Sequence, residues 1–300
     1  MDRTRSDVAV NGERELATAD GAVRLQYSAA TDVGAVRRVN EDSLLAEPPV
    51  FLVADGMGGH ARGDAASRAV VETFAAHIAA GEVSTPERIL DAVHTANRAV
   101  RELTPGDEGL AMAGTTLTGV ALVDAGEASG LNWMAFNVGD SRVYSWNGRT
   151  LEQVSVDHSA VQELIDSGLI LPEEAESHPD RNVITRAVGA HDTVEIDAWL
   201  IPVAGHQTYL VCSDGLSKEV DDASIAEVLA TAPDATDLAQ RLVDAALEHG
   251  GRDNVTAVVV ESFVDGDDDD PEATRDRLDT SDVEETTTPR DGGRDAALPA

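Results

Sequence analysis

The central part of the chain contains two consecutive segments in which apolar side chains recur at helical spacing. In GDAASRAVVETFAAHIAAG, the residues Ala66, Val70, Phe74 and Ile78 are four positions apart, which places them on one face of a helix. The next segment, STPERILDAVHTANRAVREL, begins with serine, threonine and proline, which favour the first turn of a helix. The pattern therefore predicts two helices in succession.

Apolar runs bounded by turn residues follow and predict strands. GTTLTGVALVD and LNWMAFNVGDSRVYSW come first, and Asn147-Gly148 predicts a tight hairpin turn into RTLEQVS. Short helices between His158 and His178 are expected to form a flap. The last third alternates again, with strand patterns in VEIDAWLIPV, QTYLVCSDG and NVTAVVVESF and helical patterns in ASIAEVLA and ATDLAQRLVDAALEHG. Because strands follow strands and helices follow helices, we predict an α+β fold of antiparallel sheets with helices outside.

The two ends of the chain have a different composition. Residues 1–25 are polar and lack clear periodicity, and residues 264–300 are acidic and poor in large apolar side chains. We expect both ends to be disordered and residues 26–263 to form one domain. The run Asp267 to Asp270 lacks the alternating ligands and central glycine of an EF-hand loop, so a solvated tail is favoured over a calcium site. A calcium-binding acidic protein stays open as an alternative.

Composition excludes several classes of protein. A chain of 300 residues with 42% hydrophobic content can bury a substantial core, which excludes disorder as its main state. The net charge of −34 argues against nucleic acid or an anionic membrane as a partner. The single cysteine, Cys212, rules out an internal disulfide and a thiolate zinc site. With no signal peptide and no long apolar run, we expect a cytoplasmic protein, and we expect a monomer.

Acidic residues stand at the ends of several predicted strands. Some end an apolar run at a turn and others stand just before a strand: Asp55, Asp140 and Asp214 in the first group, Glu41, Asp42 and Asp253 in the second. One Asp-Gly turn is ordinary, but several at strand ends indicate that their carboxylates converge. Such a cluster is stable only if some groups are protonated or a cation lies among them.

The ligand type indicates which cation would be bound. Oxygen-only ligands select Mg²⁺ or Mn²⁺ over zinc or copper, and Mg²⁺ normally keeps several waters. Two such ions about 3.5–4 Å apart would share a bridging water, lower its pKa and make it a nucleophile for attack on phosphorus.

A family resemblance rests on an ordered set of motifs: RRVNEDS, VADGMGGH, AGTT, VGDSRVY, DHS, TRAVG, CSDGL and GRDNVT. In this order they resemble the metal-dependent protein phosphatases of the protein phosphatase 2C type, in their bacterial form, from about Tyr27 to Phe263. The resemblance implies an αββα sandwich, in which two antiparallel sheets are flanked by helix pairs. It also implies hydrolysis of phosphoserine and phosphothreonine in proteins, with two Mn²⁺ or Mg²⁺ ions as cofactors.

The resemblance assigns metal ligands to particular residues. Asp55 is similar to the carboxylate that bridges both metals, and the carbonyl of Gly56 would bind one of them. Asp214 and Asp253 would ligate the other ion, while Glu41 and Asp42 would hold metal-bound waters. Asp140 and Asp214 would flank a third, weaker metal position.

Other residues are assigned to phosphate binding or support. Arg37 resembles the phosphate-binding arginine, whose planar fork suits two phosphate oxygens, so Arg37 and Asp55 are the candidate catalytic residues. Four further residues lie in family motifs and are expected to position the ligands: Thr115, Thr116, Arg186 and Asn254.

The chain departs from the family pattern in two places. Eukaryotic members carry a histidine directly after the Asp-Gly pair, where this chain has Met57, and a catalytic and a surface role for the nearby His60 are equally open. Lys218 stands where many relatives carry an aspartate that helps to hold the third metal. Its ammonium either faces the site and opposes a cation or turns to solvent, and the solvent orientation is slightly favoured.

Two further classes are weighed against a metal-dependent phosphatase. A cysteine phosphatase is excluded because SDGLSK follows Cys212 without an arginine. A non-catalytic phosphatase-like module that binds a regulatory partner is the main alternative, although such a protein is expected to have lost metal carboxylates. The expected partners are phosphorylated proteins, either other substrates or autophosphorylated forms of a serine/threonine kinase.

Overall fold

The structure, a computed structural model, describes residues 8–18, 21–58, 62–103, 113–126, 130–175, 177–231 and 237–264. The strands within these ranges are β1 (Val8–Thr18), β2 (Gly21–Asp32), β3 (Asp42–Glu47), β4 (Val50–Met57), β5 (Gly114–Thr115), β6 (Leu117–Asp124), β7 (Leu131–Val138), β8 (Arg142–Trp146), β9 (Leu151–Gln153), β10 (Asp197–Pro202), β11 (His206–Cys212) and β12 (Val255–Val264). The helices are α1 (Arg62–His77), α2 (Pro86–Glu102), α3 (Ala160–Asp166), α4 (Pro172–Ala175), α5 (Asp214–Ser217), α6 (Asp222–Thr231) and α7 (Leu238–His249).

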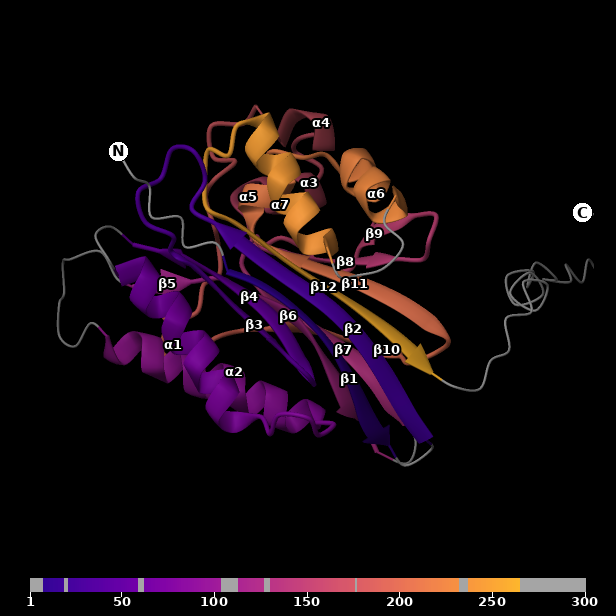
Figure 1. Ribbon diagram of the computed structural model, residues 1–300. Coiled ribbons are helices and arrows are strands. Elements are labelled where there is room, and N and C mark those ends of the chain that lie inside the picture. The colour runs from indigo at the N-terminus through magenta and orange to yellow at the C-terminus, as the bar shows by residue number, and fades with distance from the viewer. Residues whose placement is uncertain are drawn as a thin grey trace, which may run out of the picture. The chain divides into compact units, whose positions relative to one another are not determined.

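The strands form two antiparallel sheets. The first sheet has the order β1-β2-β12-β11-β8-β9, and the second has the order β10-β7-β6-β4-β3 with β5 paired to β4. Helices α1 and α2 cover the second sheet, and α5, α6 and α7 lie over the first (Figure 1). The predicted αββα arrangement is therefore confirmed.

A row of buried aromatic side chains fills the space between the two sheets. The ring centroids of Phe51 and Trp133 are 6.3 Å apart, and those of Trp133 and Tyr209 are 5.4 Å apart. The indole Nε1 of Trp133, in the second sheet, donates a hydrogen bond of 3.2 Å to Ser262 Oγ in the first. Burial of side chains of this size stabilises the fold by about 1.5–3 kcal/mol each, so these aromatics hold the sheets together.

The two predicted central helices are present. In α1 the side chains of Ala66, Val70 and Phe74 are fully buried, and Phe74 stacks on Phe136 of the second sheet with centroids 5.8 Å apart. Helix α2 begins at Pro86, and the hydroxyl of Thr85 accepts a hydrogen bond of 3.4 Å from the backbone N–H of Arg88. Among the helices that the structure describes, none is both long and apolar enough to cross a membrane.

The predicted disorder of residues 1–25 is wrong where the structure describes them. Residues 8–18 and 21–25 are strand, because β1 pairs with β2 along its whole length and β2 pairs with β12. Most side chains of β1 are exposed, and Leu16 is fully buried. Main-chain hydrogen bonds to β2 hold the strand, and such bonds produce no periodic pattern of apolar residues in the sequence. The predicted disordered tail begins at Val264, which instead ends β12, and residues 265–300 lie outside the described residues.

The segment LNWMAFNVGDSRVYSW divides between the two sheets. Strand β7 belongs to the second sheet and β8 to the first, so Asp140 lies where the chain crosses from one to the other. The predicted hairpin joins β8 to β9, but it is wider than a two-residue turn because Trp146 pairs with Leu151. The carboxamide oxygen of Asn147 closes this loop by accepting a hydrogen bond of 2.8 Å from the Thr150 N–H.

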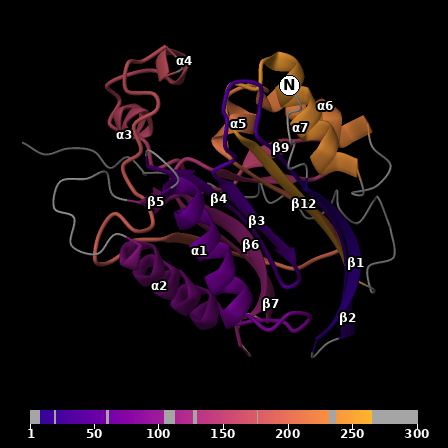
Figure 2. The ribbon, with the colours of Figure 1, turned by 60° about the vertical axis from the view of Figure 1, so that its left-hand side comes forward.

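The predicted flap consists of the short helices α3 and α4. Figure 2 shows it projecting from the sheets, apart from α5, α6 and α7. Its base is tied to the body by backbone hydrogen bonds from His158 N to Gly139 O, 2.9 Å, and from Thr185 N to His158 O, 2.8 Å.

Candidate active site

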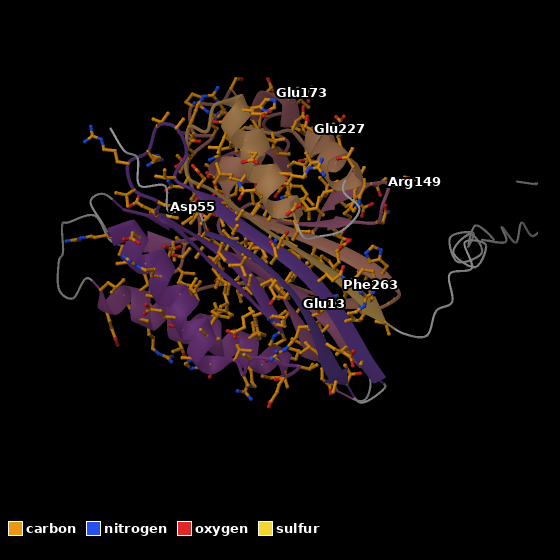
Figure 3. All side chains as sticks on the ribbon, viewed as in Figure 1. Glu13, Asp55, Arg149, Glu173, Glu227 and Phe263 are labelled. Atoms are coloured by element: carbon orange, nitrogen blue, oxygen red, sulfur yellow. The ribbon has the colours of Figure 1, made fainter. Side chains whose placement is uncertain are left out.

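Acidic side chains from both sheets meet at one end of the strands, around a cleft with a volume of about 1450 Å³. Asp55 lies near the end of β4 in the second sheet, Asp214 follows β11 and Asp253 precedes β12 in the first, and Asp140 lies at the crossing. The predicted site residues that line the cleft are Arg37, Glu41, Asp55, Gly56, Asp140, Asp214 and Asp253. Figure 3 shows Asp55 at this end and Phe263 at the opposite end.

The backbone of Asp55 is held by two threonines. Its carbonyl oxygen accepts hydrogen bonds from Thr115 Oγ1 and from the Thr116 N–H, both at 2.9 Å. Its own N–H donates to Thr116 Oγ1 at 2.9 Å, and that hydroxyl is 2.8 Å from Ser141 Oγ. Both threonines therefore position Asp55 through its main chain.

Gly56 is required by close packing at the same point. A Cβ on Gly56 would lie 2.2 Å from the carbonyl oxygen of Gly63, near the N-terminus of α1, and 2.6 Å from the carbonyl oxygen of Glu41. The Gly56 N–H donates a hydrogen bond of 3.1 Å to that same Glu41 carbonyl. The backbones of β4, α1 and the loop before β3 thus converge next to Asp55.

Asp42 lies directly opposite Asp55 in the β3–β4 pair and is buried behind the cleft. Its Oδ2 accepts hydrogen bonds from Ser213 Oγ at 2.8 Å and Thr256 Oγ1 at 2.7 Å, which join the two sheets. Burial raises the pKa of Asp42 to about 7, and the nearby Asp214 and Asp253 add to the increase against the effect of the hydroxyls.

Like charges also raise the pKa values of other carboxyl groups in the cluster. Burial raises the pKa of Asp55 well above its ordinary value, and Asp42, Asp214, Asp140 and Asp253 raise it further. Burial and Asp214 raise the pKa of Asp140 to about 6, although Lys218 acts in the opposite direction. The site therefore concentrates more negative charge than it can hold without protons or cations.

The residues present fit the cations that the sequence implies. Two buried carboxylate oxygens, Asp42 Oδ1 and Asp140 Oδ1, have no hydrogen-bond partner, and every predicted side-chain ligand is an oxygen donor. In the part of the chain that the structure describes, no three acidic, histidine or cysteine side chains are grouped so as to hold one ion. The all-oxygen donor set thus suits Mg²⁺ or Mn²⁺, whose coordination shells also include several waters.

Arg37 lies on the rim of the cleft and contacts one of the predicted ligands. Its Nη2 donates a hydrogen bond of 2.7 Å to Asp253 Oδ2. Asn254 holds the loop on both sides of Arg37. Its Nδ2 donates hydrogen bonds to Val33 O and Val39 O, both at 3.0 Å. Asn254 Oδ1 also accepts from the Glu41 N–H at 2.9 Å, so this side chain positions the loop that carries Arg37 and Glu41.

Lys218 faces the site, and the favoured solvent orientation is therefore wrong. Its ammonium forms an ion pair with Asp214 Oδ2 and lies 3.5 Å from Asp140 Oδ2. Burial by itself lowers the pKa of Lys218, but Asp214 and Asp140 outweigh burial and raise it. Two carboxylates from different parts of the fold attract this side chain inward.

The structure does not bring Arg186 into the cleft. Its Nη1 donates to Asp197 Oδ1 at 2.9 Å, and Asp197 Oδ2 is 3.1 Å from His158 Nε2. The Gly139 N–H donates to His158 Nδ1 at 3.1 Å, so this network supports the turn that carries Asp140. His158 lies in the DHS motif, but no sequence pattern connects it with Asp197, which ends up beside it only through folding.

Met57 and His60 are the two positions near the Asp-Gly turn at which the sequence raised the question of a catalytic histidine. Met57 lines the cleft after the Asp-Gly pair, and His60 lies outside the described residues. The partly buried pair Arg142 and Asp157 also lines the cleft, with Nη2 and Oδ2 2.7 Å apart, although it was not predicted from the sequence. Asp157 precedes His158 in the DHS motif, which is the signal that could have identified it.

Comparison with known proteins defines the class of protein. Residues 38–250 match the family described as Protein phosphatase 2C. The chain is 41% identical over 242 residues to the serine/threonine protein phosphatase PstP of Mycobacterium tuberculosis, covering 79% of this chain and 45% of that protein. It is 33% identical over 243 residues to the serine/threonine phosphatase stp of Listeria monocytogenes, covering 77% of this chain and 93% of that protein.

Solved structures agree with this assignment. The crystal structure of the catalytic domain of the serine/threonine protein phosphatase PstP in complex with two manganese ions superposes with a TM-score of 0.69, at 35% identity. The match covers 81% of this chain and 100% of that one. The chain belongs to the protein phosphatase 2C family. It spans slightly less than half the length of the Mycobacterium tuberculosis relative.

Proposed function

We propose that this protein is a serine/threonine protein phosphatase that hydrolyses phosphoserine and phosphothreonine with two Mn²⁺ or Mg²⁺ ions. The observation that carries the proposal is the convergence of Asp55, Asp214 and Asp253 with Arg37 in one cleft, from segments far apart in the chain. The naming of the relatives as serine/threonine phosphatases, and the two manganese ions of one related structure, support the same conclusion.

Each acidic residue has a separate task in this proposal. Asp55 and the Gly56 carbonyl would hold one ion, and Asp214 and Asp253, together with Asp55, would hold the other. Glu41 and Asp42 orient waters of the metal shell. When bound, the two ions would supply Lewis acidity, which activates a water as the nucleophile for hydrolysis of the phosphate ester.

Arg37 binds the phosphoryl group of the substrate. Its guanidinium lies at the cleft beside Asp253, with half of the side chain exposed, so it reaches both the ligand shell and a phosphate that enters from solvent. A planar fork of N–H donors contacts two phosphate oxygens at once and orients them for in-line attack.

We propose that the substrates in the cell are phosphorylated proteins, either other substrates or autophosphorylated forms of a serine/threonine kinase. An open cleft of about 1450 Å³ accommodates a side chain that carries a phosphate together with part of its polypeptide. We further propose that the protein acts in the cytoplasm as a monomer. Phosphoproteome comparison of cells with and without the active enzyme would identify the substrates.

Hydrolysis of p-nitrophenyl phosphate and of a phosphothreonine peptide tests the proposal directly. We expect turnover with Mn²⁺ or Mg²⁺ and loss of turnover in EDTA, with recovery when the metal is restored. Full activity after exhaustive chelation would exclude the two-metal mechanism. Absence of turnover in a folded, metal-loaded protein would favour the non-catalytic binding module instead.

A further inference from the structure

Lys218 places a positive charge between two carboxylates that the motif resemblance assigns to metal binding. Its ammonium forms an ion pair with Asp214 Oδ2, and the distance from Nζ to Asp140 Oδ2 is 3.5 Å. Lys218 caps the C-terminal end of α5, four residues after Asp214, so the geometry of this short helix directs both side chains to the same side.

The two carboxylates come from different sheets. Asp140 follows β7 of the second sheet, and Asp214 follows β11 of the first. The side chains of Asp140 and Asp214 are 6% and 13% exposed, so solvent screens their repulsion poorly. The ammonium is therefore a counter-charge to both carboxylates and offsets their mutual repulsion.

The position of Asp140 also affects the base of the flap. Gly139, its neighbour, accepts a hydrogen bond of 2.9 Å from His158 N and donates one of 3.1 Å to His158 Nδ1. The chain runs from His158 into α3 of the flap. A counter-ion that holds Asp140 thus also steadies the segment from which the flap projects.

We propose that Lys218 is a built-in cation of the active site, which takes the place of a divalent ion between Asp140 and Asp214. The chain then binds metal ions at Asp55, Asp214 and Asp253 but not at the position between Asp140 and Asp214. Lys218 is a positioning residue in this arrangement, since it orders the Asp140 turn before any metal binds. The inference rests on the proposed function only for the identity of the ions.

The opposing outcome is that Lys218 pairs with the carboxylates only while metal is absent. Its side chain is 42% exposed, so it has room to rotate toward solvent. In that case an incoming ion displaces the ammonium, and removal of the lysine leaves the number of bound ions unchanged.

Direct Mn²⁺ binding to the full chain separates these outcomes without any measurement of turnover. Free Mn²⁺ is counted by electron paramagnetic resonance during titration of the wild type, Lys218→Met, Lys218→Asp and Lys218→Arg. Arg181→Met is the matched control, because Arg181 is an exposed cleft residue whose guanidinium contacts only the His178 carbonyl among the described residues. The acidic tail is present in every variant, so its own binding cancels in the comparison.

We expect Lys218→Met and Lys218→Asp to bind one more Mn²⁺ per chain than the wild type, with the tighter binding in Lys218→Asp. The affinity for this ion should rise about tenfold or more, the effect of one unit charge within about 4–6 Å. Lys218→Arg and Arg181→Met should bind as the wild type does. Equal stoichiometry and affinity in the wild type and Lys218→Met would overturn the inference while leaving the proposed function intact.

A second measurement covers the metal-free protein. In EDTA, Lys218→Met should lower the melting temperature, and the loss should become much smaller in an Asp140→Asn background, as in a double-mutant cycle. Independent effects of the two substitutions would contradict the inference. If no variant binds Mn²⁺, both the proposed function and this inference fail. If all variants bind Mn²⁺ equally, only this inference fails.

Discussion

Arg37 and Asp253 are 216 positions apart in the chain, yet Arg37 Nη2 lies 2.7 Å from Asp253 Oδ2. The register of the first sheet explains this contact, because Asp32 of β2 is paired with Val255 of β12. The loop after β2 and the turn before β12 therefore leave the sheet side by side. Sheet pairing thus brings a candidate phosphate ligand next to a candidate metal ligand.

Arg37→Ala should mainly raise KM for phosphorylated substrates, with some loss of kcat, because charge on the phosphoryl oxygens changes in the transition state. Hydrogen bonds to charged groups contribute about 1.5–3 kcal/mol, so kcat/KM should fall about 10- to 100-fold. Steady-state kinetics with a phosphothreonine peptide measures both constants. The neighbouring exposed Arg38→Ala is the control, and unchanged kinetics in Arg37→Ala would remove Arg37 from the site.

Asp55→Asn should abolish turnover while stabilising the metal-free protein. The substitution removes a charge that burial and four other carboxylates oppose, so the melting temperature in EDTA should rise by about 2–4 °C for each kcal/mol gained. The exposed Asp91→Asn on α2 should change neither property. A lower melting temperature in EDTA would show that Asp55 serves the core more than the metals.

The stability of metal-free protein should fall as pH rises from about 4 to about 7. In this range the folded protein retains a proton on Asp42, whose pKa is about 7, while the unfolded chain has released it, so deprotonation favours unfolding. Urea unfolding of dialysed protein at several pH values measures the slope. Asp42→Asn should have a shallower slope and Asp91→Asn a slope parallel to the wild type; parallel slopes in all three would contradict the shift.

Leu16→Ala should destabilise the domain by about 2–5 kcal/mol, the usual cost of truncating a fully buried leucine. Glu15→Ala, next to it on the exposed side of β1, should have almost no effect. Chemical denaturation of both variants makes the comparison. Equal stability of Leu16→Ala and the wild type would mean that β1 contributes little to the fold in solution.

Deletion of residues 265–300 should leave turnover of p-nitrophenyl phosphate nearly unchanged. The composition of this segment offers too little apolar surface to form part of a core. The kcat and KM of the shortened and full-length chains provide the measurement, with the melting temperature as a control for folding. A large loss of activity would show that the tail docks on the domain.

The sequence by itself determined most elements and located the acidic residues of the site. A helix such as α1 is recognisable because its buried residues, Ala66, Val70 and Phe74, repeat with the local geometry of the helix. Asp55 and Asp214 could be found because each stands at the end of an apolar strand pattern. A strand leaves the buried core at its end, and a carboxylate is tolerated there. Local rules were sufficient for these features.

The tertiary structure alone decided how those ends meet. Strand β1 is stabilised by main-chain pairing at a sheet edge, which carries little side-chain signal, so residues 8–18 could not be separated from a disordered end. The inward direction of Lys218 depends on Asp214, four residues earlier in α5, and on Asp140, which reaches it from the other sheet. The charge of Asp140 comes close to Lys218 only after the sheets have packed, so no local pattern contains it, and the tertiary structure completes the orientation that the local pair with Asp214 begins.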